Sequence, residues 1–309
     1  MNTQSHAMPG SPLDSQGIAP AAVSATRPLY WSVRRELWEN RSIYIAPLAV
    51  AAVALCGFCF STIAGIWEPA LRLDPTQPRE AVAMPYDIAA GLMMLTGIVV
   101  SVFYCLDALH GERRDRSILF WKSLPVSDLT TVLSKASIPL VVLPLLTFVI
   151  AVAMQWAMLL LSSAVLLASG QSVAVLWTKV SFFQMSRLLL YHFLTAHALW
   201  PLPIYCWLLL VSGWPRRATF LWAALPLVAI AGVERIAFRT WHFAALVGGR
   251  LIGDTPNISH AAGDMFPTSP MTHITPGRFL ISPGLWIGLI VAAAFLAAAV
   301  RLRRYQGPI

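Results

Sequence analysis

Long apolar runs constrain the fold of this chain more than any other feature of its sequence. Of its 309 residues, 57% are hydrophobic and 12% are charged, with a mean hydropathy of +0.67. A soluble domain carries roughly 25% charged residues, and around 20 apolar helical residues cross a hydrocarbon core of about 30 Å. Because sheet edges would be unpaired in lipid, the sequence predicts an all-α, polytopic membrane protein. Six windows have the required length, at residues 43–67, 88–109, 138–168, 188–211, 218–237 and 284–303.

The third window is longer than one crossing requires. As a helix, its 31 residues would extend roughly 46 Å at about 1.5 Å per residue. Pro139 and Pro144 stand in its first turns, where proline removes a backbone donor and bends a helix. These turns are therefore predicted to form a bent approach to the span.

The positions of arginine and lysine predict the orientation of the spans. With both termini in the cytoplasm, the short cytoplasmic segments are dense in positive charge, and the outer loops are long and dilute. The net charge of +8 is then explained by topology and by attraction to anionic headgroups of the lipid bilayer. No basic run is interleaved with stacking aromatics, so nucleic acid is not an expected partner.

Residues 1–27 are rich in Pro, Ser, Gln and Ala and lack the apolar core of a signal peptide. They are predicted to be a disordered cytoplasmic tail before a single transmembrane domain, residues 28–309. The cysteines all fall inside predicted spans, which favours simple buried thiols over a disulfide framework. They are Cys56, Cys59, Cys105 and Cys206.

Residues 28–41, just before the first span, have an amphipathic pattern. Leu29, Val33 and Leu37 recur at helical spacing, while charged residues occupy the opposite arc. This pattern predicts a helix lying in the cytoplasmic membrane interface; the alternative is a simple extension of the first span. Its candidate interfacial residues are Trp31, Arg34, Arg35, Glu36 and Trp38.

A charged and patterned segment, residues 110–136, separates the second and third spans. Written as a helix, it gathers Phe120 and Trp121 on an apolar arc with charged residues opposite. Glu112 stands four residues before Arg116, the favourable order for an ion pair on a helix.

The same segment also contains a helix break and a new helix start. Pro125 disfavours helix at the residue before it, and Ser127 is placed to cap a second helix. We expect a helical hairpin outside the bilayer with an aromatic face. It either docks a partner or rests on lipid without one.

Residues 112–128, ERRDRSILFWKSLPVSD, with their flanking spans, resemble the permease subunits of ATP-binding-cassette (ABC) transporters of the type-2 exporter class. The resemblance implies a coupling helix seated on a cytoplasmic ATPase subunit, and residues 28–41 resemble the elbow helix of the class. It further implies a second permease subunit, as a homodimer or heterodimer, export of an unidentified substrate, and a bacterial inner-membrane location. The contact set implied for the ATPase is Glu112, Arg113, Arg114, Phe120, Trp121, Lys122 and Pro125.

The chain lacks the phosphate-binding loop that an ATPase needs. That loop places a lysine directly after a glycine, whereas Lys122, Lys135 and Lys179 are the only lysines and none follows a glycine. The chain is therefore not expected to be an enzyme or to bind a cofactor. ATP and Mg are expected on the partner ATPase.

Two other classes of protein are alternatives to this interpretation. A gradient-driven secondary transporter would place ionisable groups at mid-membrane, but Glu234 and Arg235 lie near a predicted span end, where they can snorkel or pair with each other. A non-transporting protein that signals through its cytoplasmic hairpin also fits the pattern.

No catalytic or metal-binding residue is nominated, because His192 and His197 lack zinc-site spacing. The outer loop, residues 238–283, names no ligand.

Overall fold

The structure is a computed structural model that describes residues 26–64, 79–123, 126–170, 172–179, 181–252 and 276–305. Within these ranges the chain forms helices and their connections, without a strand. The predicted tail before residue 26, the middle of the predicted outer loop at 253–275, and Pro125 lie outside the described residues.

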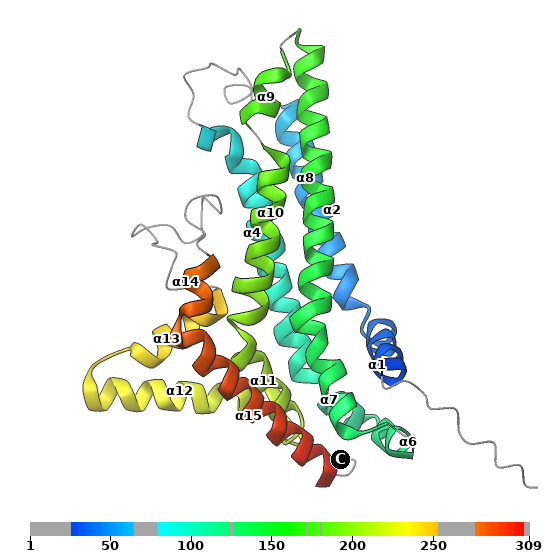
Figure 1. Cartoon of the computed structure of the whole chain (residues 1–309), viewed down its shortest axis with the longest axis vertical. Coiled ribbons are helices and arrows are strands. Elements are labelled where there is room, and N and C mark those ends of the chain that lie inside the picture. The colour runs from blue at the N-terminus through cyan, green and yellow to red at the C-terminus, as the bar shows by residue number, and fades with distance from the viewer. Residues whose placement is uncertain are drawn as a thin grey trace, which may run out of the picture.

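Figure 1 shows the described helices in chain order, coloured from blue to red. Those from the first half are α1 (Thr26–Glu39), α2 (Ser42–Ile63), α4 (Arg79–Asp107), α5 (His110–Arg114), α6 (Ser117–Ser123), α7 (Asp128–Ser137), η1 (Ile138–Val142) and α8 (Leu143–Ala168). Those from the second half are α9 (Ala174–Lys179), α10 (Phe182–His192), η2 (Phe193–Leu199), α11 (Leu202–Ser212), α12 (Thr219–Phe238), α13 (His242–Ile252), α14 (Pro276–Ile281) and α15 (Pro283–Tyr305).

Five described helices are long and apolar enough to cross a membrane, and a sixth crossing is obtained if one bent pair is a single span. The pair is Leu176–Leu199 with Leu202–Ser212, which meet at 44°. Pro201 and Pro203 account for the break, since neither can donate a backbone hydrogen bond to the preceding turn. The all-α prediction is confirmed, and the number of apolar helices agrees with the predicted spans.

The third predicted span is one continuous helix from Asp128 to Ala168, 41 residues long. The irregularity expected at its prolines is a π-helical turn, η1, in which the Leu143 amide donates to the Ile138 carbonyl five residues back. Pro139 lies inside this turn and has no amide hydrogen. The wider π-helical turn therefore leaves no backbone N–H of residue 139 without an acceptor.

The fifth predicted span, α12, runs across the direction of α2 and α8 in Figure 1 instead of alongside them. It packs against α11, α13 and α4. Ala223 is its one buried residue, Leu227 is half-buried, and most of its other large apolar side chains are exposed in this single chain. Length and hydropathy identify such a helix but contain no information about its direction.

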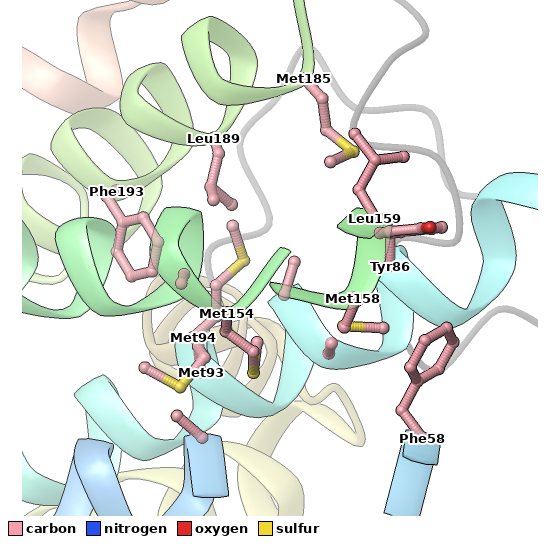
Figure 2. Close-up of a cluster of buried hydrophobic side chains, with 14 of the residues drawn as sticks. Phe58, Tyr86, Met93, Met94, Met154, Met158, Leu159, Met185, Leu189 and Phe193 are labelled. Atoms are coloured by element: carbon pink, nitrogen blue, oxygen red, sulfur yellow. The ribbon is translucent and has the colours of Figure 1, made fainter. Parts of the chain in front are cut away.

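Two apolar clusters form most of the core. One contains five methionines, Met93, Met94, Met154, Met158 and Met185, packed with aromatic rings between α4, α8 and α10 (Figure 2). Methionine is flexible and fills irregular gaps where helices cross. The second cluster joins α4, η1 and α11 around Tyr104, Ile138 and Tyr205.

All four cysteines are free thiols, as expected, but not all are buried. Cys105 is buried in the second cluster and Cys206 is buried against Leu202 and Ala292, whereas Cys59 is half-buried and Cys56 is exposed on α2. The prediction of burial is thus wrong for Cys56. Apolar composition places a cysteine in a span without deciding which side of the helix it occupies.

Candidate functional site

Charged side chains gather where α1, α5, α6, α7 and the last turns of α15 meet, at the bottom of Figure 1. We call this region the polar end. It contains both segments that the sequence singled out, residues 28–41 and 110–136. The helical bundle extends from it on the opposite side.

The segment between the second and third predicted spans contains two short helices, α5 and α6, and then α7, which continues into η1 and α8. α5 ends at Arg114, and Arg116 has a left-handed φ of 57°, so α6 starts in a new direction. The Ser127 hydroxyl accepts a hydrogen bond from the Thr130 amide at 3.1 Å, which caps α7 as predicted. The break near Asp115 was not predicted, because no glycine or proline marks it.

Glu112 is buried at the centre of the polar end. Its Oε1 lies 2.6 Å from Nη2 of Arg35 in α1 and 3.1 Å from Nζ of Lys135 in α7. Its Oε2 lies 2.5 Å from Nη1 of Arg303 in α15. One carboxylate therefore joins four helices. The predicted pairing with Arg116 is replaced by these contacts, because the chain turns out of the helix before Arg116.

A second buried carboxylate, Glu36 of α1, completes the cluster. It accepts from Lys135 at 2.8 Å, from the Tyr104 hydroxyl of α4 at 2.9 Å, and from Arg35 at 3.1 Å. We refer to Arg35, Glu36, Glu112, Lys135 and Arg303 as the ionic cluster.

The charges of the ionic cluster nearly balance, with three cations and two carboxylates. Burial alone would lower the pKa of Arg35, but the nearby carboxylates, Glu36 first, outweigh it and raise that pKa. Removing one member of a buried, hydrogen-bonded ion group typically costs about 3–5 kcal/mol, because its partners are left buried without compensation. The cluster therefore fixes the relative positions of its helices.

Two further contacts tie the polar end to the rest of the fold. Arg303 also reaches Asp128 at the start of α7, with 3.2 Å between Nε and Oδ1. Arg113 donates to the carbonyl oxygens of Gly213 at 2.5 Å and Trp214 at 3.2 Å, in the turn between α11 and α12. Through these contacts α15 is joined to α7, and α5 is joined to the turn between α11 and α12.

In contrast, α6 presents apolar side chains outward. Leu119 and Phe120 are 58% and 59% exposed, while Ile118 is buried beneath them. Trp121 is half-buried, with the Arg35 guanidinium 3.7 Å from its ring centre. A cation over an indole ring at this distance holds α6 against α1.

The residues implied by the family resemblance thus fall into separate groups. Glu112 and Arg113 are buried inside the fold and Trp121 contacts α1, whereas Arg114, Phe120 and Lys122 are exposed. Pro125 lies outside the described residues. Any contact of Glu112 with a partner would be indirect in this arrangement.

The candidate residues of α1 also divide by direction. Arg34 lies 5.2 Å from the ring centre of Trp31 and 4.9 Å from that of Trp38, and both indoles are exposed. Arg35 and Glu36 instead turn toward α5 and α7 in the ionic cluster.

Sequence reasoning missed Lys135, Arg303 and Tyr104 as parts of this site. Lys135 offered a signal, since it is one of three lysines and stands at the start of a long apolar helix. A charge there needs a partner. Arg303 shares its helix end with two other arginines, so nothing in its pattern marked it.

These helices and this polar end are consistent with a helical membrane protein that carries a fixed ionic site at one end of its bundle. No protein-family model and no curated protein matches the chain.

Proposed function

We propose that this chain is the membrane-spanning permease subunit of an ABC exporter, receiving energy at the polar end from a separate ATPase subunit. The polar end faces the cytoplasm in this proposal, with both termini on that side of a bacterial inner membrane. ATP and Mg are bound by the partner, and a second permease subunit, identical or different, completes the transporter.

The observation that carries the proposal is the exposure of the neighbouring side chains Leu119 and Phe120 on α6, at the end of the bundle that also holds the ionic cluster. Neighbouring apolar side chains of this size, exposed beside charged residues, are typical of a protein contact. Arg114, Arg116 and Lys122 flank them and supply a positively charged rim.

The ionic cluster explains how force at α6 would reach the membrane. Segment α5–α7 is fastened to α1 and α15 through Glu112 and continues directly into α8. A partner that closes on ATP would move these helices together, as packed elements move in hinge and shear transitions.

The α1 helix would lie against the cytoplasmic leaflet. The exposed indoles of Trp31 and Trp38 suit the headgroup zone, and Arg34 between them suits anionic lipid. The apolar exterior of α12 would be covered by lipid or by the second permease subunit.

The test is co-purification in detergent with candidate ATPase subunits. Phe120→Ala and Leu119→Ala should abolish association or ATPase stimulation while the protein inserts and folds normally. Leu129→Ala is the matched control, because Leu129 is 54% exposed on α7 at the same end but lies off α6. Unchanged association in both α6 variants would rule out the docking surface.

A gradient-driven transporter is the second candidate, and one observation favours it. Asp87 lies within α4, just outside the window predicted for the second span, and its Oδ1 is buried without a hydrogen-bond partner among the described residues. Asp87 falls within the apolar helix Met84–Arg114, and an ionisable group within such a helix is a candidate proton or ion site. Transport by the chain alone in proteoliposomes, lost in Asp87→Asn, would select this function over the first.

A further inference from the structure

A cavity of about 350 Å³ lies between α11, α12, α13 and α15, away from the polar end. Apolar side chains dominate its lining, including Trp207, Leu227, Ile230, Val247, Val291 and Phe295. Its volume is at the lower end of the range of about 300–1,000 Å³ found for small-molecule sites. A cavity of this size and polarity suits one alkyl chain better than the two chains of a phospholipid.

Arg250 of α13 is the only charged residue in the cavity lining. Its Nη1 donates to the Trp200 carbonyl at 3.1 Å, and its Nη2 donates to the Gly284 carbonyl at 2.6 Å. The guanidinium also lies 4.6 Å from the ring centre of Trp200. These contacts hold α13 against the break before α11 and against the start of α15.

The positive charge of Arg250 is not matched by an anion in the part of the chain that the structure describes. A guanidinium has five N–H donors, and the carbonyl contacts leave donors available. Carbonyl oxygens and an aromatic ring carry no net charge, so the cation is held in place without being neutralised. A half-buried arginine in an apolar setting normally has an acidic partner.

Gly288 of α15 is shaped to this guanidinium. A Cβ at that position would lie 2.4 Å from Nη1 of Arg250. The absence of a side chain therefore lets the charged group lie against α15 at the cavity. Since the guanidinium is the end of a flexible side chain, a methyl group at residue 288 would displace it without forcing the helices apart.

We infer that this cavity binds a long-chain fatty-acid anion, with the alkyl chain in the apolar space and the carboxylate on Arg250. A carboxylate is planar and pairs with a guanidinium through parallel hydrogen bonds. A single chain matches the volume, and a single negative charge matches the single cation. The site is independent of the proposed coupling function, because no residue of the polar end takes part in it.

The experiment is photolabelling of the full-length protein in detergent with a diazirine analogue of palmitate, followed by peptide mapping. Labelling is expected to be saturable and to fall on α11, α12 or α15 next to the cavity. Unlabelled palmitate should compete at least tenfold better than hexadecanol, which has the chain but not the charge, as expected for a charge-assisted hydrogen bond. Equal competition by hexadecanol would overturn the inference.

Two matched pairs of variants test the role of the cation. Arg250→Gln should lower labelling about tenfold, while Arg239→Gln, an exposed arginine at the end of α12, should not. Gly288→Ala should also weaken labelling, because it moves the guanidinium while favouring the helix. Gly232→Ala is its control, since nothing lies within 4 Å of a Cβ there.

Asp254 and Asp264 follow α13 in the sequence, outside the described residues. If the unmodified protein is not labelled but an Asp254→Asn, Asp264→Asn double variant is, then a carboxylate of this chain is paired with Arg250. That result would overturn the inference, as would unchanged labelling in Arg250→Gln.

Discussion

Nη1 of Arg303 in α15 lies 2.5 Å from Oε2 of Glu112 in α5, although 191 residues separate them in the sequence. This contact joins the last long helix to the segment between the second and third spans. Arg35 and Lys135 bind the other oxygen of the same carboxylate. The polar end is therefore organised around one acidic side chain.

Replacing Glu112 with glutamine should destabilise the protein by about 3–5 kcal/mol, because three buried or half-buried cations lose their shared carboxylate. The measurement is unfolding of the purified protein in mixed micelles. Asp115→Asn is the control; Asp115 pairs with Arg114 at 3.2 Å, but both side chains are more than half exposed. Its effect should stay within about 0.5 kcal/mol. Similar losses in both variants would contradict the central role of Glu112.

The two acidic partners of Arg303 should differ in coupling energy. Double-mutant cycles with Arg303→Gln should give about 2–3 kcal/mol with Glu112→Gln, since that pair is buried. The cycle with Asp128→Asn should give about 1 kcal/mol or less, because Asp128 is partly exposed. The reverse order would mean that α15 is attached chiefly through α7.

Loss of the cap on α7 should have a smaller but measurable effect. Ser127→Ala removes the acceptor for the Thr130 amide and should cost about 1 kcal/mol of unfolding free energy. Ser123→Ala is a matched control, because its exposed hydroxyl bonds only to the Phe120 carbonyl three residues back. If both serines have equal effects, the α7 cap is not a stabilising element.

The turn between α5 and α6 predicts opposite effects of glycine at neighbouring arginines. Arg116 has a φ of 57°, so Arg116→Gly should stabilise the protein by about 0.5–1 kcal/mol by removing left-handed strain. Arg114→Gly lies within α5 and should instead cost about 1 kcal/mol. Paired unfolding measurements decide this, and a loss in Arg116→Gly would exclude strain at the turn.

The sequence predicted those parts of the fold that depend on local patterns. Apolar length identified the helices that are long enough to cross a membrane, and Ser127 identified the start of α7, because caps and hydropathy act over a few residues. The break at Pro201 has a local signal in the sequence, the two prolines at 201 and 203, although the apolar window 188–211 continues across it. The turn at Arg116 has no such signal in the sequence, because a left-handed conformation that usually favours glycine is adopted there by an arginine.

The ionic cluster could not be predicted from one sequence, because its members are brought together by tertiary packing. Glu112 has a good helical partner in Arg116 by spacing alone, and only the turn at Asp115 removes that option. Its real partners include Arg35, 77 residues before it. The direction of α12 could not be predicted either, because the hydropathy of a helix does not depend on its orientation relative to the other helices.

The order of synthesis gives the Arg303–Glu112 contact a further consequence. At translation rates of about 5–20 residues per second, the 191 residues between them take about 10–40 s to make. Arg35 and Lys135 are available to Glu112 long before Arg303 has been synthesised. The polar end therefore passes through a stage in which Glu112 lacks Arg303, and α15 closes it only after the preceding helices have been made. A chain that fails to deliver its last helix would retain an incomplete charge group there, with Glu112 held only by Arg35 and Lys135.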